Sequence, residues 1–476
     1  MSDLNYHGNW FIAGGKQYPG TLEINKDTGK IVLEIYSGET IEGFKNSITN
    51  NPAYYNHDFI FGEGFGGPFT LHNCQLNGVS LIGNDFYKCK YLIEYVIYGV
   101  IAEHSKELLI ESGRFLFPGL ADWYDGWKHT EVLNNLQGKL TDLHLEKSES
   151  LRINDELELV FNDHVDSRIE EINFSYLITY NKSLNLNYRN PVTFKRLLND
   201  AVTFLKLLEF SKSKPLNCLL LGLKLPIVVK PGESNYYRVS SFALSKNKKV
   251  DRHSSVSVHM IFNHDKLGNK DTLNSLIIKW YGHNDFSNII GYYLDSNNWF
   301  QDIDGAVLSN VMFNNRFLNL IQGLEDYYRE QHYNENNEVE FNANKSAVLK
   351  RITDDPSLKQ WLNNTFKYTS YLSLAEKLKI IVADCMPDLI SLYSPISFDT
   401  FPKAAADFRN TLSHGKNKSI NLGEKFHLHY QIARLLLLIC ILKSLDIKDI
   451  KRLLHRHFRL DRNMQEIIRL QKIYVD

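Results

Sequence analysis

The chain has 476 residues, about three times the ~150 residues that serve as a soft prior for one domain, so we expect two or three folded units. Hydrophobic residues make up 43% and charged residues 23%, which are globular proportions and exclude a disordered, collagenous or disulfide-scaffold protein. The formal net charge is −1, so the chain as a whole carries no field that would attract nucleic acid or a membrane.

The first 230 residues carry mainly strand and turn patterns. Two β-branched runs, 21–24 and 30–36, flank the turn residues Asn25-Lys26-Asp27-Thr28-Gly29, a pattern typical of a hairpin. Apolar side chains in 194–210 recur at i, i+3, i+4 and i+7, which predicts an amphipathic helix. The glycine-rich residues 62–67 are predicted to form a flexible loop. Further strands are predicted at 69–76, 91–102, 156–161, 172–180 and 217–225.

The rest of the chain turns from mixed to helical. A strand pattern at 254–262 precedes helical pieces over 272–293, and the polar, Asn-rich residues 335–344 are predicted to form a loop. Pro387 and Pro395 are expected to mark breaks or kinks between helices. Helical periodicity covers 305–332, 346–365, 371–392, 400–413, 424–445 and 447–473.

These patterns predict an α+β multidomain protein. We expect a β-rich domain at 1–230, a mixed connecting region at 231–300 and an all-helical bundle at 301–476. The five cysteines include no C-x-x-C pair, which argues against a thiolate metal site and fits a reducing compartment. No signal-peptide pattern begins the chain, and the longest apolar run, 435–442, is far shorter than the roughly twenty residues of a membrane span. We therefore expect a cytoplasmic protein without a membrane partner.

Charge separates along the chain. Residues 1–300 carry 30 Lys and Arg against 34 Asp and Glu, and residues 301–476 carry 24 against 21. From Lys403 to the end there are 15 Lys and Arg against 7 Asp and Glu, a net charge of +8, with five further histidines. This basic segment is either a solvated helix surface or a nucleic-acid contact.

One pair of residues in the basic segment carries recognisable chemistry. Arg409 is followed by Asn410 and, after three further residues, by His414. An imidazole exchanges a proton near neutral pH and a guanidinium holds a phosphate through two donors, so the pair suits phosphodiester cleavage. The spacing also occurs from Arg452 to His457, but arginines and histidines alternate there as on a surface helix. Asn410 distinguishes the first pair because its amide can bind a phosphate or orient the imidazole.

Helix geometry restricts how this pair can work. Five residues along an α-helix turn about 500° and rise about 7.5 Å, which leaves Arg409 and His414 about 140° apart. The two side chains would not meet one phosphate in a straight helix. Either the helix ends near Gly415, or a second subunit supplies part of the site. A twofold dimer would bring two such pairs into one cleft.

The motif Arg409-Asn410-x-x-x-His414, followed by a long aliphatic helix, resembles the HEPN superfamily of metal-independent ribonucleases. Phe317-Leu318-x-x-Ile321-x-x-Leu324-Glu325-x-x-Tyr328-Arg329 resembles the first long helix of its Apea-like branch. At the N-terminus, Gly8-Asn9-Trp10 and Pro19-Gly20-Thr21-Leu22 are similar to the opening of the β-rich ApeA-type domain that is fused to such modules.

The resemblance implies a cytoplasmic endoribonuclease that acts in bacterial abortive defence against phage, as a homodimer and without a metal or other cofactor. His414 would assist attack of the ribose 2′-hydroxyl on the adjacent phosphate, Arg409 would stabilise the transition-state charge, and Asn410 would position either group. The products would carry a 2′,3′-cyclic phosphate. Transfer RNA is the substrate expected by resemblance, and the residues do not distinguish it from messenger or ribosomal RNA. The N-terminal domain would sense a phage-derived trigger or restrain the nuclease.

Four further residues are weaker candidates. Lys416 and Lys418 could hold flanking RNA phosphates or could belong to an ordinary surface loop. Glu325 and Arg329 could be polar groups near the cleft, or an i,i+4 pair on a helix surface. The alternative function is a noncatalytic scaffold that dimerises or binds nucleotide, with Arg409 in a structural ion pair with Asp407 or Glu325.

Overall fold

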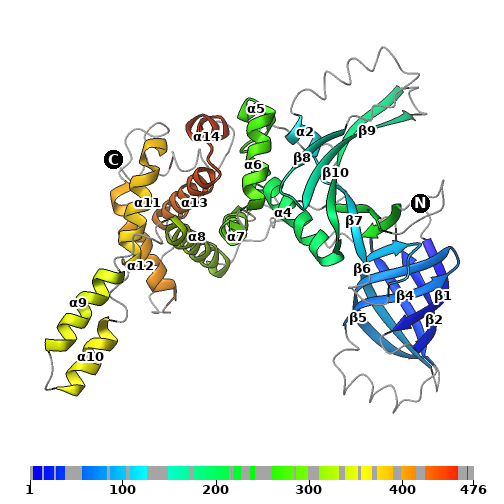
Figure 1. Ribbon diagram of the computed structural model, residues 1–476, viewed down its shortest axis with the longest axis horizontal. Helices are drawn as coiled ribbons and strands as arrows, with labels where there is room; N and C mark the ends of the chain where they lie inside the picture. The colour runs from blue at the N-terminus through cyan, green and yellow to red at the C-terminus, as the bar shows by residue number, and fades with distance from the viewer. Residues whose placement is uncertain are drawn as a thin grey trace. The chain divides into compact units, whose positions relative to one another are not determined.

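The structure is a computed structural model that divides into two compact units (Figure 1). Unit 1 comprises Met1–Leu208, Leu216–Ser257 and Asn263–Tyr281, and unit 2 comprises Glu209–Pro215, Val258–Phe262 and Gly282–Asp476. The structure describes residues 4–12, 16–25, 28–37, 56–82, 86–102, 108–125, 148–170, 175–213, 216, 218–226, 236–241, 260–282, 286–297, 310–331, 338–351, 355–366, 372–389, 398–413, 424–458 and 469.

Unit 1 begins with a closed antiparallel barrel, drawn in blue in Figure 1. Neighbouring strands follow the order β3-β2-β1-β4-β5-β6, and β3 also pairs with β6, which closes the sheet on itself. Apolar side chains alternate toward the interior, where Trp10, Leu22, Ile60 and Leu71 are fully buried. The strands are β1 (Leu4–Ile12), β2 (Lys16–Ile24), β3 (Ile31–Ser37), β4 (Asn56–Gly64), β5 (Gly67–Ile82) and β6 (Phe86–Tyr98).

Strand β6 connects the barrel to the second half of the sheet. One edge of β6 pairs with β3 between Tyr87 and Leu92, and with β12 between Tyr95 and Ile97. From β12 the order continues β11-β7-β10-β9-β8, again with antiparallel neighbours. These strands are β7 (Leu109–Leu116), β8 (Ser148–Arg152), β9 (Leu157–Glu170), β10 (Ser175–Thr193), β11 (Leu219–Lys224) and β12 (Tyr236–Ser241).

Four helices complete or border unit 1: α2 (Leu120–Tyr124), α4 (Phe194–Lys212), α5 (His264–Leu267) and α6 (Lys270–Gly282). The α4 side chain Phe204 packs edge-on against the rings of Phe117 and Trp123. Helix α6 is tied to α4 by the Trp280 Nε1, which donates to the Thr203 carbonyl at 2.8 Å. The core of this half is therefore aromatic and lies between the sheet and α4.

The sequence predictions for unit 1 are largely confirmed. The 21–36 hairpin forms, and the Asn25 side chain accepts hydrogen bonds from the Thr28 N–H and hydroxyl. The predicted helix is α4, and the predicted strands overlap β5, β6, β9, β10 and β11. The predicted bounds are too long at the end of β6, which stops at Tyr98, and at the end of β11, which stops at Lys224. The flexible loop at 62–67 is wrong, because a two-residue turn joins β4 directly to β5. A Cβ at Gly62 would lie 2.6 Å from the Trp10 ring, so this glycine permits close packing.

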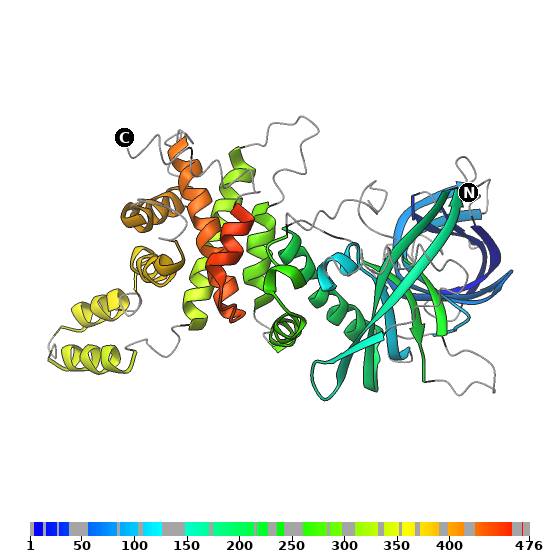
Figure 2. The ribbon, with the colours of Figure 1, turned by 90° about the horizontal axis from the view of Figure 1, so that it is seen from above.

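Unit 2 is a helical bundle that surrounds α13, and the sequence expectation of an α+β protein with a C-terminal helical domain is confirmed. Helix α8 packs against α13 closely enough that a Cβ at Gly323 would lie 2.9 Å from the Leu437 side chain. Figure 2 shows α9 and α10 (yellow) as a pair of neighbouring helices. The helices are α7 (Phe286–Asn297), α8 (Asn310–Gln331), α9 (Glu338–Arg351), α10 (Pro356–Phe366), α11 (Leu374–Leu389), α12 (Phe401–Ser413), α13 (Glu424–Ser444) and α14 (Ile450–Phe458).

Several details of the prediction for this half of the chain differ from the structure. The helical segment predicted at 346–365 is divided between α9, which ends at Arg351, and α10, which begins at Pro356. The loop predicted at 335–344 is wrong from Glu338 onward, because α9 begins there and packs against α10, and tertiary contact overrides the weak helix propensity of asparagine. Pro387 lies in the last turn of α11 rather than between helices, whereas Pro395 lies outside the described residues. Of the strand predicted at 254–262, residues 254–259 lie outside the described residues, and residues 260–262 do not form a strand.

The connecting region predicted at 231–300 is divided between the units at Tyr281. Its described elements β12, α5 and α6 belong to unit 1, and α7 belongs to unit 2. Two short segments that precede this point also belong to unit 2. In that unit the Phe210 ring lies 5.9 Å from Phe262 and 5.4 Å from Tyr293, measured between ring centroids.

Helix α13 is apolar over most of its length. Its residues Lys425–Ser444 have the length and mean hydropathy, 1.3, of a membrane-spanning helix, but 83% of that window is buried inside the protein. Residues from Ile432 to Leu442 are at most 4% exposed. These properties are typical of the central helix of a bundle.

Candidate functional site

Helix α12 places Arg409 at the surface of unit 2. The buried face of α12 carries Phe401 and Ala405, and Phe408 extends the same stripe. The Phe408 ring packs against Phe317 of α8 at 6.3 Å and Phe426 of α13 at 5.1 Å, measured between centroids. Since Phe408 fixes the rotation of α12 against two helices, its neighbour Arg409 is directed along the edge of the bundle.

The Arg409 guanidinium is 38% exposed and lies beside a carboxylate from another helix. Its Nη2 is 3.9 Å from the Glu325 Oε2, which is within ion-pair range but longer than a hydrogen bond. Glu325 lies on α8 and is 15% exposed. The Lys377 Nζ of α11 lies 3.5 Å from the other carboxylate oxygen. Three helices thus bring two cations to one largely buried carboxylate.

Of the other predicted site residues that follow Arg409 in the chain, the structure describes only Asn410. Asn410 is exposed on α12, one position beyond Arg409. His414 follows the last residue of α12, Ser413, and it lies outside the described residues together with Lys416 and Lys418. The roles of all these residues remain predictions.

Glu325 and Arg329 do not form the i,i+4 pair that was the alternative for them. Arg329 is 65% exposed and pairs with Asp326 at 3.4 Å on its own helix. Glu325 instead pairs with Lys377 and Arg409. The structure therefore brings Glu325 to the predicted motif and leaves Arg329 at the solvent surface. The Glu325 contact is also one of the two structural ion pairs considered for Arg409.

A buried histidine lies behind the motif. His429 of α13 is 3% exposed, its ring lies 5.6 Å from Phe408, and its Nδ1 has no hydrogen-bond partner. Burial, with a smaller effect of the Lys425 charge, lowers the pKa of His429 to about 4. At neutral pH the imidazole is therefore uncharged. It packs as an aromatic ring and supports the position of α12.

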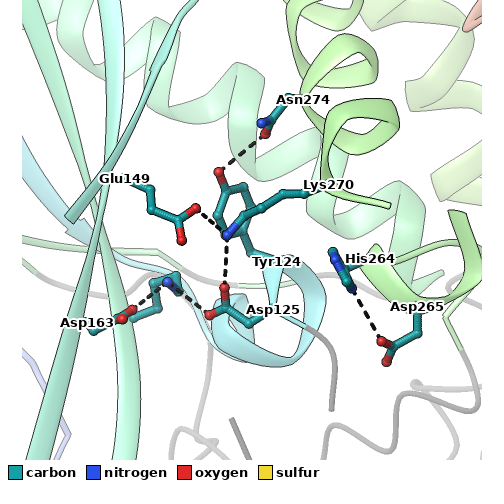
Figure 3. Close-up of polar contacts among 9 residues, drawn as sticks. Tyr124, Asp125, Glu149, Asp163, His264, Asp265, Lys270 and Asn274 are labelled. Atoms are coloured by element: carbon teal, nitrogen blue, oxygen red, sulfur yellow. Dashed lines mark hydrogen bonds and ion pairs between the residues drawn. The ribbon is translucent and has the colours of Figure 1, made fainter. Parts of the chain in front are cut away.

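A second polar cluster lies in unit 1 (Figure 3). Lys182 of β10 is 1% exposed, and its Nζ lies 2.9 Å from Asp125 and 2.5 Å from Asp163. Lys270 of α6 pairs with the other Asp125 oxygen at 3.4 Å and with Glu149 of β8. Its Nζ also lies 4.3 Å from the centroid of the Tyr124 ring.

The cluster joins α2, α6 and three strands, and each lysine is matched by carboxylates. The Tyr124 hydroxyl donates to the Asn274 Oδ1 at 3.3 Å, and its ring stacks on Phe161 at 3.8 Å. Such a network of satisfied charges indicates a structural role. Among the residues that the structure describes, no group of three or more His, Cys, Asp or Glu side chains is placed to hold a metal ion.

The sequence patterns do not single out Lys377, Lys182 or Lys270. A local signal for Lys377 exists, since Ser373 and Glu376 form a capping box in which the Glu376 carboxylate accepts from the Ser373 N–H at 2.8 Å. This pattern marks the start of α11 and places Lys377 in its first turn. No pattern in the sequence indicates that Glu325, 52 residues earlier, is its partner.

Comparison with known families extends over most of the chain. The family described as ApeA N-terminal domain 1 matches residues 5–280, more than half of the chain. The family described as Apea-like HEPN matches residues 318–450, a range that includes Glu325, Lys377, Arg409 and His414. The resemblance noted from the sequence is therefore confirmed. Comparisons with curated proteins and with solved structures found no match.

Proposed function

Because the chain belongs to the family of proteins that join an ApeA N-terminal domain to an Apea-like HEPN domain, we propose that it is an endoribonuclease. The observation that carries this proposal is the placement of Arg409 within the matched HEPN region. Its side chain is 38% exposed, and among the described residues the carboxylate beside it is that of Glu325, 3.9 Å from Nη2. A guanidinium with this exposure can donate to a phosphate, which a fully enclosed structural arginine could not contact.

In the proposed reaction the ribose 2′-hydroxyl attacks the adjacent phosphorus while His414 accepts its proton. The P–O5′ bond breaks, the 5′-oxygen takes up a proton, and a 2′,3′-cyclic phosphate remains on the upstream fragment. Arg409 stabilises the negative charge on the phosphorane oxygens, and the exposed Asn410 orients either group. RNA supplies its own nucleophile, so this route needs no metal to activate water.

We further propose the biological setting that the family resemblance suggests. The enzyme acts in the cytoplasm during abortive defence against phage, and its N-terminal domain senses a phage-derived trigger or restrains the nuclease. Two copies form a homodimer that joins two Arg409 and His414 pairs in one cleft. Transfer RNA is the proposed substrate, with Lys416 and Lys418 holding phosphates that flank the cleavage site.

The test compares purified parent protein with His414→Ala and Arg409→Ala on bulk transfer RNA, with and without EDTA. We expect either substitution to lower the cleavage rate by about 10²-fold or more, because each removes transition-state stabilisation. Arg452→Ala is the matched control, since Arg452 is exposed on α14 and begins an equivalent spacing to His457. Mapping of the RNA ends checks for cyclic phosphates. Cleavage by His414→Ala at the parent rate would refute the assignment, and loss of cleavage in EDTA would refute the metal-free route.

A noncatalytic scaffold is the second candidate, and the ion pair between Arg409 and Glu325 favours it. In a scaffold this pair would only connect α12 to α8. Arg409→Ala would then lower the free energy of unfolding without changing any reaction on RNA. Toxicity on expression that disappears in His414→Ala would favour the nuclease instead. Sequencing of RNA ends from cells that express either protein would identify the substrate.

A further inference from the structure

The Glu325 carboxylate has two cationic neighbours of unequal closeness. Lys377 approaches one oxygen at 3.5 Å, and Arg409 approaches the other at 3.9 Å. Lys377 is 20% exposed and Arg409 is 38% exposed. The less accessible lysine therefore makes the closer contact, and the more accessible guanidinium is held loosely.

This arrangement matters because Arg409 cannot use the same N–H donors for the Glu325 carboxylate and for an RNA phosphate. A carboxylate that is 15% exposed interacts strongly with a neighbouring cation, since few waters screen the pair. If Glu325 had only Arg409 as a partner, the two groups could approach in the bidentate geometry that arginine and carboxylate favour. The donors engaged in that pair would be lost to the RNA phosphate.

We propose that Lys377 is a positioning residue that keeps Arg409 available for catalysis by neutralising Glu325. This inference rests on the proposed nuclease function and adds a residue to its site. Lys377 stabilises the Glu325 carboxylate, so Arg409 can turn toward a phosphate without leaving a largely buried anion unpaired. Glu325 in turn keeps the guanidinium near the end of α12 before RNA binds.

The placement of Lys377 supports a role beyond helix stability. It lies in the first turn of α11, where the helix dipole disfavours a positive charge. Glu376, its neighbour, already forms the capping box with Ser373. Lys379 on the same helix is exposed, and Lys377 is the lysine whose side chain reaches the carboxylate beside Arg409.

The experiment measures kcat and KM for cleavage of bulk transfer RNA by the full-length parent, Lys377→Met, Glu325→Gln and the double variant. We expect Lys377→Met to lower kcat by about tenfold with little change in KM, because transition-state stabilisation is lost while binding is kept. Glu325→Gln in the Lys377→Met background should restore kcat to within about threefold of the parent, since the competing anion is gone. Lys377→Arg should retain activity, and Lys379→Met is the matched control.

The outcomes distinguish this positioning role of Lys377 from direct binding of RNA and from a purely structural role. If Lys377 instead held an RNA phosphate directly, Lys377→Met would raise KM, weaken the salt dependence and remain defective in the double variant. If Lys377 were only structural, Lys377→Met would lower the melting temperature but would leave kcat, measured on folded protein, unchanged. Either result, or full activity of Lys377→Met, overturns the inference. A parent protein that cleaves no RNA would refute the proposed function itself, which His414→Ala tests separately.

Discussion

Replacement of Lys182 by methionine would remove the central charge of the cluster in unit 1 while keeping a side chain of similar length. Lys182 is 1% exposed and lies between Asp125 and Asp163, which are 11% and 13% exposed. The substitution leaves Asp163 without this partner and leaves Asp125 with Lys270 at 3.4 Å. Both carboxylates stay largely shielded from water.

The expected loss follows from these distances. At an effective dielectric constant of about 20, unit charges at the 2.9 Å separation of Lys182 and Asp125 attract by roughly 6 kcal/mol. Desolvation of the charges offsets much of that attraction in the parent. In the variant the Asp163 carboxylate has lost the Lys182 charge but still carries the cost of its own desolvation. Removal of one partner of a buried pair typically lowers the free energy of unfolding by about 3–5 kcal/mol. The unfolded fraction of unit 1 should therefore rise by roughly 150-fold to 5,000-fold.

Urea denaturation followed by tryptophan fluorescence measures this loss, because Trp10 and Trp123 are fully buried in unit 1. Lys270→Met is the matched control. Lys270 is 27% exposed, so we expect a loss of about 1 kcal/mol. Asp163→Asn in the Lys182→Met background should recover part of the stability, since it removes the uncompensated charge. A Lys182→Met loss below that of Lys270→Met, or a double variant less stable than Lys182→Met, would refute this reasoning.

Two further properties can be measured on the parent protein. Burial lowers the pKa of His429 to about 4, whereas a histidine in the unfolded chain has a pKa of about 6.5. As the pH falls below about 6.5, the unfolded chain therefore binds a proton at this residue before the folded protein does. His429 should therefore lower the stability of unit 2 by about 2 kcal/mol between pH 7.5 and pH 5, and a His429→Phe variant without a shallower pH dependence would contradict this. Burial also raises the pKa of the thiols of Cys74, Cys89 and Cys440, so alkylation at pH 8 should reach Cys218 first. Fast labelling of Cys74 in native protein, detected by mass spectrometry, would contradict that expectation.

The elements that the sequence predicts best are those whose periodicity matches a single buried face. Helix α4 is an example, because Phe194, Leu197, Phe204 and Leu208 recur at helical spacing and are all buried. Strand β1 was missed. Its residues Leu4–Ile12 pair with both β2 and β4. Apolar Leu4, Tyr6, Trp10 and Ile12 lie at alternate positions as in a strand, and Gly8 interrupts the apolar series.

The candidate site was predictable only in part, because local patterns indicate single residues but not the tertiary contacts between them. Arg409 and Asn410 follow from a local spacing, and Glu325 follows from the family pattern of α8. Their arrangement depends on how α8, α11 and α12 pack, which a single sequence does not encode in any local window. Lys377 illustrates the limit, since its helix start can be read from Ser373 and Glu376, whereas its contact with Glu325 is a tertiary one.

The division of the chain has a consequence for how such proteins can be recombined. The two family matches lie one after the other in sequence, at 5–280 and 318–450, which suggests that one module could be exchanged at a single junction. Unit 2, however, also contains Glu209–Pro215 and Val258–Phe262, and it packs Phe210 against Tyr293. A chimera joined at Gly282 would transplant the HEPN-matched unit without part of its own core. Exchange of the N-terminal module between relatives would therefore have to preserve these two inserted segments, which couples the evolution of the two modules.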